Sequence, residues 1–265
     1  MSATEALCLT KFMNENDMKD WILWHIEKCK IDHIHFINND SKFDLESLCK
    51  HFKDKVSYEE FHGIPRQYKL YDEYINYKSK SEWIIPIDDD EYLEISKEFD
   101  SVGSVIEYYK DCFPDIEMLA VRWKHLFPLK FKSERDCSVL DYCVREHLTL
   151  ASTFQSIGDM GIKTFVHRSG KVHYQETWEN PEGGHVPLHE KANCAIGFDG
   201  SKIRGNSFHS IPLDRSNEKI RLIHCRYRGY SDYLNKYDNN TSIRISDKEP
   251  REKKFIFDTL LPSLD

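Results

Sequence analysis

The sequence predicts an α/β fold with a mixed, mostly parallel sheet flanked by helices. Two observations support this prediction: strand-like and helix-like patterns alternate in the first third of the chain, and residues 83–87 have the continuous hydrophobicity of a strand buried on both faces. Alternating strands and helices favour a parallel sheet with helical crossovers. The 265 residues, 40% of them apolar, are sufficient for a single domain with a sizeable core.

The expected elements of the first third follow from apolar spacing and from turn formers. In the segment 14–28, Trp21 and His25 lie one helical turn apart, and Asn14 can cap the first turn. Residues 38–41 are turn formers that end the preceding strand. In this part of the chain we expect strands at 6–12, 33–37, 56–58 and 83–87, and helices at 14–28, 44–52 and 65–78.

The rest of the chain is less regular. Ser169 and Gly170 form a turn between two strand candidates, and residues 246–254 are rich in charge, as in a solvated linker before a terminal helix. In this part we expect helices at 101–110, 138–147 and 231–237, and strands at 118–127, 162–167, 171–178 and 220–226.

The composition narrows the classes of function. A formal net charge of −8 argues against a basic nucleic-acid footprint, so we expect no nucleic-acid partner. The eight cysteines are scattered without a Cys-x-x-Cys pair, which favours free thiols over a zinc or disulfide scaffold. The first residues do not resemble a signal peptide, and no apolar run approaches the roughly 20 residues of a spanning helix. We therefore expect a cytoplasmic protein without a transmembrane segment, either bacterial or viral in a host cytoplasm.

Four consecutive carboxylates, residues 88–91, follow the apolar run. Neighbouring like charges repel one another by on the order of 1 kcal/mol per pair, and a divalent cation removes this repulsion. Carboxylate oxygens suit Mg²⁺ or Mn²⁺, which keep open positions for water and substrate phosphates. In an extended chain, Asp88 and Asp90 point to one side and Asp89 points to the other. A charged surface turn is the alternative, but a position at the ligand-binding edge of a parallel sheet favours a metal site.

Several motifs together resemble a known group of enzymes. Residues 14–15 are Asn-Glu at a helix start, an Asn-Asn-Asp-Ser turn follows at 38–41, and residues 83–93 are Trp-Ile-Ile-Pro-Ile-Asp-Asp-Asp-Glu-Tyr-Leu. These motifs resemble those of the GT-A fold glycosyltransferases that include glycosyltransferase family 92 and related family 2-like enzymes. More loosely, Lys163 followed by His185 resembles a later Lys…His segment of the group.

The resemblance implies one GT-A (Rossmann-like) domain, with residues 1–93 as its nucleotide-binding half and 94–240 as its acceptor-binding half. Residues 241–265 would be a charged linker and a C-terminal helix. The implied activity is that of a hexosyl- or pentosyltransferase, which moves a sugar from a nucleotide-sugar donor, a UDP-sugar, to a hydroxyl of a glycan or glycoconjugate acceptor. The implied cofactor is Mn²⁺ or Mg²⁺, and the implied stereochemistry is inversion.

The resemblance also implies the site residues. The metal ligands would be Asp88, Asp90 and His185, a loop residue whose neighbours Gly183 and Gly184 allow a close approach. The residues implied to bind the nucleotide-sugar are Lys11, Asn14, Asp40, Gln67, Asp88, Asp89 and Arg228.

An inverting transfer needs a general base within hydrogen-bond reach of the acceptor hydroxyl. Asp136 and Asp159 are candidates because they lie near element boundaries in the expected acceptor half. Glu182 is a third candidate because it is close to His185 in the sequence. The sequence does not single out one of these carboxylates.

Two other classes of protein remain as alternatives. A sugar nucleotidyltransferase also uses paired carboxylates, but residues 11–15, which follow the first expected strand, lack the glycine of a triphosphate-binding loop. A non-catalytic nucleotide- or glycan-binding module of the same fold is the second alternative. The presence of both Asp88 and Asp90 argues against it.

Overall fold

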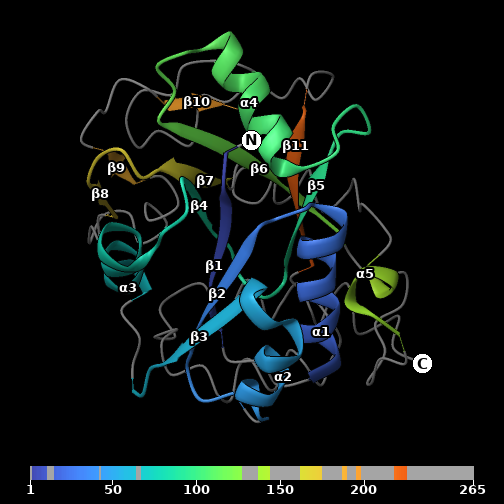
Figure 1. Ribbon diagram of the computed structural model, residues 1–265. Helices are drawn as coiled ribbons and strands as arrows, with labels where there is room; N and C mark the ends of the chain where they lie inside the picture. The colour runs from blue at the N-terminus through green and yellow to red at the C-terminus, as the bar shows by residue number, and fades with distance from the viewer. Residues whose placement is uncertain are drawn as a thin grey trace, which may run out of the picture.

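The computed structural model describes residues 2–10, 15–41, 43–63, 67–126, 137–143, 162–174, 187–189, 195–197 and 218–225. The strands in these residues are β1 (Thr4–Thr10), β2 (His33–Asn38), β3 (Val56–Glu60), β4 (Trp83–Pro86), β5 (Glu91–Ile95), β6 (Met118–His125), β7 (Ile162–His167), β8 (Val172–His173), β9 (Leu188–His189), β10 (Ala195–Gly197) and β11 (Ile220–His224). Figure 1 shows how they assemble, with most of them in one twisted sheet.

The helices pack around this sheet. They are α1 (Glu15–Leu23), which continues as the π-helix η1 (Trp24–Lys28), α2 (Leu45–Phe52), the short 3₁₀ turn η2 (Lys53–Lys55), α3 (Gln67–Glu73), which continues as the π-helix η3 (Tyr74–Lys78), α4 (Val102–Cys112) and α5 (Val139–Tyr142). No helix in the described part of the chain is long and apolar enough to cross a membrane. The seven cysteines that the structure describes are free thiols, as expected.

The main sheet confirms the predicted fold class. Within the described residues its strand order is β3-β2-β1-β4-β7-β6-β11-β5, and β10 pairs with β6. The first four strands in this order are parallel to one another, as the alternation of strands and helices predicts. β7 then lies antiparallel between β4 and β6, and β5 lies antiparallel to β11 at the far edge. The molecule is thus a single α/β domain with a mixed, mostly parallel sheet flanked by helices.

The apolar core has two parts, one on each face of the sheet, and alternate side chains of β1 contribute to each. Ala6 and Cys8 belong to the larger apolar cluster, together with residues of α1, α2 and α4. Leu7 belongs to the smaller cluster, which Tyr71 and Ile75 of α3 and η3 complete. In Figure 1, accordingly, α3 stands apart from α1 and α2. Each large apolar side chain buried in this way stabilises the fold by about 1.5–3 kcal/mol.

The edge strand β5 is held by side chains of α1 and η1. The indole N–H of Trp21 donates to the carbonyl oxygen of Glu91 at 2.8 Å, and that of Trp24 donates to the carbonyl oxygen of Leu93 at 2.6 Å. The backbone N–H of Leu93 donates to Nε2 of His25 at 3.2 Å. These bonds fix the strand that directly follows the acidic segment.

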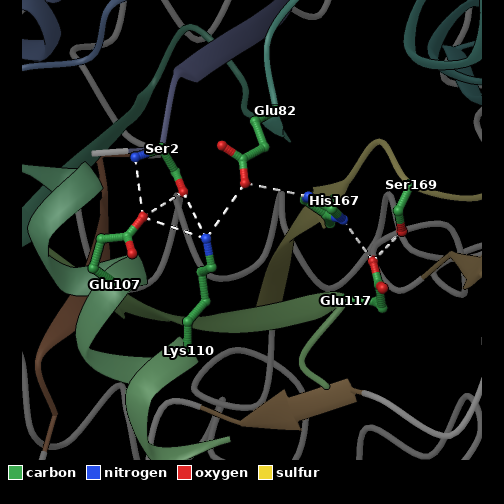
Figure 2. A network of polar contacts seen from close by, with 7 residues as sticks. All are labelled: Ser2, Glu82, Glu107, Lys110, Glu117, His167 and Ser169. Carbon is green, nitrogen blue, oxygen red and sulfur yellow. Dashed lines mark hydrogen bonds and ion pairs between the residues drawn. The ribbon is translucent and has the colours of Figure 1, made fainter. Parts of the chain in front are cut away.

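A polar network joins the strands at the end of the sheet opposite the acidic segment 88–91 (Figure 2). Glu82 Oε1, just before β4, lies 3.4 Å from both Lys110 Nζ and His167 Nε2. The other ring nitrogen of His167 lies 2.6 Å from Glu117 Oε2, just before β6. Because β7 is antiparallel to its neighbours, its last residue can meet the first residues of β4 and β6 at this end.

Candidate functional site

The carboxyl ends of β1, β2 and β4 meet at one edge of the sheet. The carbonyl oxygen of Thr10, at the end of β1, accepts a hydrogen bond from the backbone N–H of Asn39 at 2.8 Å. The hydroxyl of Thr10 donates to Asp89 Oδ2 at 3.2 Å. These two contacts join the end of β1 to the turn after β2 and to the segment after β4. Residues 11–14, which follow β1, lie outside the described part of the chain.

The four carboxylates at 88–91 form a tight turn, which we call the acidic turn. It is closed by a hydrogen bond from the backbone N–H of Glu91 to the carbonyl oxygen of Asp88 at 3.1 Å. The expectation of an extended chain, with Asp88 and Asp90 on one side and Asp89 on the other, is wrong here because alternation applies only to extended backbone. The three aspartates instead face three different strands: β7, β1 and β11.

Asp88 is held from two sides. Its Oδ1 accepts a hydrogen bond from Gln67 Nε2 of α3 at 3.2 Å, and its Oδ2 accepts one from Lys163 Nζ of β7 at 3.0 Å. The backbone N–H of Asp88 donates to Glu91 Oε2 at 2.7 Å, and Lys163 Nζ lies 3.6 Å from that same oxygen. The amide group of Gln67 also donates to the hydroxyl of Tyr71 at 2.6 Å. Gln67 was predicted to bind the donor, and in the structure its side chain orients Asp88.

Charge is concentrated beneath the acidic turn. The side chain of Glu91 is 0% exposed and that of Lys163 is 3% exposed. Burial raises the pKa of Glu91 well above its usual range, and the neighbouring Lys163 acts against this shift. Burial acts to lower the pKa of Lys163, but Asp88 and Glu91 outweigh it and raise the pKa. Glu91 Oε1 is buried and has no hydrogen-bond partner among the described residues, which is costly for a carboxylate oxygen.

Asp90 faces β11. Its backbone carbonyl oxygen accepts from the N–H of Cys225 at 2.8 Å, and its Oδ1 lies 3.5 Å from His224 Nε2. The carboxylate is 2% exposed and the histidine ring packs against Trp123, with ring centroids 4.8 Å apart. β11 brings this histidine to the acidic turn because it pairs with both β5 and β6.

The turn after β2 borders the same edge of the sheet. The side-chain amide of Asn38 donates to both carboxylate oxygens of Glu60, and that of Asn39 donates to backbone carbonyls beyond β3. Asp40 has a left-handed backbone (φ 61°), and its exposed carboxylate accepts from His62 Nδ1 at 2.8 Å. The predicted nucleotide-pocket residue thus lies at the end of β2, one strand away from β1.

The structure describes five of the predicted site residues and brings four of them together: Gln67, Asp88, Asp89 and Asp90, with Asp40 at a nearby strand end. Lys163 was expected only as part of a motif. The position of a single lysine within the mainly apolar strand β7 does, however, indicate a buried charge. The predicted residues that lie outside the described part of the chain are Lys11, Asn14, Asp136, Asp159, Glu182, His185 and Arg228.

The carboxylates of the acidic turn are ligands of the type that hard divalent cations prefer. Among the residues that the structure describes, no group of three or more His, Cys, Asp or Glu side chains converges as a complete metal site. Asp88 and Asp90 nevertheless offer two carboxylates from one turn. Mg²⁺ and Mn²⁺ sites of the phosphate-binding kind use one or two carboxylates together with water and phosphate oxygens.

Comparisons with known proteins leave the family open. No protein-family model matches the chain, and no curated protein matches it. Among solved structures, the chain is similar to S. aureus TarS 1–349 in complex with UDP-GlcNAc, with 11% identity, a TM-score of 0.42, and coverage of 79% of this chain and 61% of that one. It is also similar to glucosyl-3-phosphoglycerate synthase from Mycobacterium tuberculosis in complex with Mn²⁺, UDP and glucosyl-3-phosphoglycerate, with 10% identity, a TM-score of 0.32, and coverage of 63% and 57%.

The chain therefore spans less than two thirds of either structure. Identities and TM-scores this low assign neither a family nor an activity. The function is argued below from the site itself and from the sequence motifs.

Proposed function

We propose that this protein is a metal-dependent glycosyltransferase of the GT-A type, which transfers a sugar from a UDP-sugar to a hydroxyl of a glycan or glycoconjugate. The observation that carries the proposal is the acidic turn at the carboxyl edge of a mostly parallel sheet, where open α/β sheets bind their ligands. The motif at residues 83–93, which resembles that of this group of enzymes, supports the same conclusion.

Each part of the site then has a role. Asp88 and Asp90, with His185, would hold Mn²⁺ or Mg²⁺, which when bound offsets the charge that develops on the leaving diphosphate. Asp40 would accept hydrogen bonds from the base or ribose, because an ionised carboxylate is an acceptor only. Asp89, tied to Thr10, orders the turn next to the end of β1.

The remaining proposed roles belong to residues outside the described part of the chain. Lys11, Asn14 and Arg228 would complete the donor site together with Gln67 and Asp89. Asp136 or Asp159 would remove the proton from the acceptor hydroxyl, and direct attack of that oxygen on the anomeric carbon inverts the configuration.

Calorimetric titration of UDP, GDP and TDP, each with and without Mn²⁺, tests the donor site. We expect Mn²⁺-dependent binding of UDP by the wild type, at least ten-fold weaker binding by Asp90→Asn, and unchanged binding by Asp54→Asn, a substitution of an exposed carboxylate on η2. Absence of binding to all three nucleotides by the folded wild type would refute the proposal. Mn²⁺-dependent hydrolysis of the bound UDP-sugar separates an enzyme from a non-catalytic binding module.

A further inference from the structure

A buried lysine lies directly beneath the acidic turn. Lys163 belongs to β7, whose residues 162–166 are all buried, and its side chain is 3% exposed. A buried ammonium group is costly unless carboxylates compensate it. Two carboxylates do so here: Asp88 Oδ2 at 3.0 Å and Glu91 Oε2 at 3.6 Å. The ring of Trp123 lies alongside, with its centroid 6.0 Å from the ammonium nitrogen.

The direction of β7 explains why this lysine reaches the turn. The antiparallel register pairs Ile84 of β4 with Val166 of β7. Moving three residues back along β7 leads to Lys163, and moving three residues forward along β4 leads to Ile87, immediately before the acidic turn. A strand parallel to β4 would run the other way and would bring its carboxyl end, not its first residues, to this edge.

Asp88 and Glu91 differ in their exposure, although both contact the lysine. The side chain of Glu91 is 0% exposed, whereas that of Asp88 is 33% exposed and is also held by Gln67. Each carboxylate oxygen can accept more than one hydrogen bond. Asp88 is therefore held by the protein and still reaches solvent, where a ligand can approach it.

We propose that Lys163 is a positioning residue for donor binding, which fixes the carboxylate of Asp88 in addition to compensating the buried Glu91. This inference rests on the proposed function, because it concerns the same cation and nucleotide. Lys163, a residue of the second half of the chain, would thus orient Asp88, a carboxylate of the first half.

Two substitutions separate positioning from charge compensation. Lys163→Met alone leaves Glu91 buried without its counter-ion, and we expect a lower Tm and weaker UDP binding in the presence of Mn²⁺. The double variant Lys163→Met with Glu91→Gln removes both buried charges at nearly constant volume, so its Tm should recover to that of Glu91→Gln alone. Its affinity for UDP with Mn²⁺ should stay about 10- to 100-fold below that of Glu91→Gln, as is usual when a supporting residue of a metal site is lost.

The affinities come from calorimetric titration well below the Tm of each variant, with UDP and Mn²⁺ as the probes. Equal affinities of the double variant and of Glu91→Gln would overturn the positioning role and leave the proposed function intact. Absence of UDP binding by the wild type would overturn both. If Lys163→Met alone does not fold, the comparison of the double variant with Glu91→Gln still decides the question.

Discussion

We expect the buried His25 to make the stability of this protein depend on pH. It is fully buried, and both of its ring nitrogens have backbone partners: Nδ1 lies 2.8 Å from the carbonyl oxygen of Trp21, and Nε2 lies 3.2 Å from the backbone nitrogen of Leu93. Because the N–H of Leu93 donates, Nε2 must accept, and the single ring proton is on Nδ1. The native environment therefore requires the neutral imidazole, and burial lowers the pKa of His25 to about 3.

The sign and size of the effect follow from proton linkage. An unfolded histidine takes up its proton near pH 6.5, whereas the folded one does so only near pH 3. Between these values the unfolded state binds one more proton, so the free energy of unfolding falls by about 1.4 kcal/mol for each unit that the pH falls. From pH 6.5 to pH 5, His25 alone should therefore cost about 2 kcal/mol. His35, whose pKa burial lowers to about 4, acts in the same direction.

Urea unfolding at several pH values between 5 and 7.5 measures this slope for the wild type and for His25→Gln. The glutamine carbonyl can still accept from Leu93 but does not titrate. We expect the variant to lose about 1 kcal/mol at neutral pH with the bond to Trp21, and to show a slope shallower by about 1.4 kcal/mol per pH unit below pH 6.5. Equal slopes for the two proteins would refute the reasoning.

His62→Gln is the control for this experiment. The exposed His62 is hydrogen-bonded to Asp40, which raises its pKa, so its contribution to stability has the opposite sign and is present below the unfolded pKa. Removal of the His62 imidazole must therefore not reduce the slope of the free energy of unfolding against pH.

Two further predictions concern single hydrogen bonds. Gln67→Leu removes the bond to Asp88 Oδ1 at 3.2 Å and should weaken Mn²⁺-dependent UDP binding about ten-fold by calorimetry; unchanged binding would count against the orientation of Asp88 by α3. Ser101→Ala removes the capping box of α4, in which Ser101 and Ser104 bond to each other's backbone N–H, and should lower the free energy of unfolding by about 1 kcal/mol. Ser101→Gly should cost only a few tenths of a kcal/mol, and an equal loss in both variants would point to a cause other than the cap.

The part of the fold that could be predicted from the sequence is the part that depends on local patterns. The alternation of strands and helices places β1, β2, β3 and β4 in one parallel arrangement, and the turn formers at 38–41 mark the end of β2. The position of the acidic turn at the ligand-binding edge follows directly from this order.

The rest depends on long-range pairing. No local pattern records that β7 enters antiparallel between β4 and β6, so the approach of Lys163 to Asp88 could not be predicted. Strand β5 was not predicted because Glu91–Ile95 is short and its pairing partner, β11, lies about half the chain away. For the same reason the approach of His224 to Asp90 was not predicted.

The hydrogen bonds from side chains of α1 and η1 to β5 also bear on whether the protein associates with other chains. Edge strands offer unpaired backbone groups that can template association with other chains. On β5, the indoles of Trp21 and Trp24 and the ring of His25 occupy backbone groups that another chain would otherwise pair with. At the opposite edge, β3 carries Glu59, which is paired with Lys78 at 2.8 Å, and Glu60; charged side chains of this kind disfavour pairing of an edge strand with another chain. The two ends of the sheet are thus protected from aggregation in different ways, one by side-chain hydrogen bonds and the other by charge.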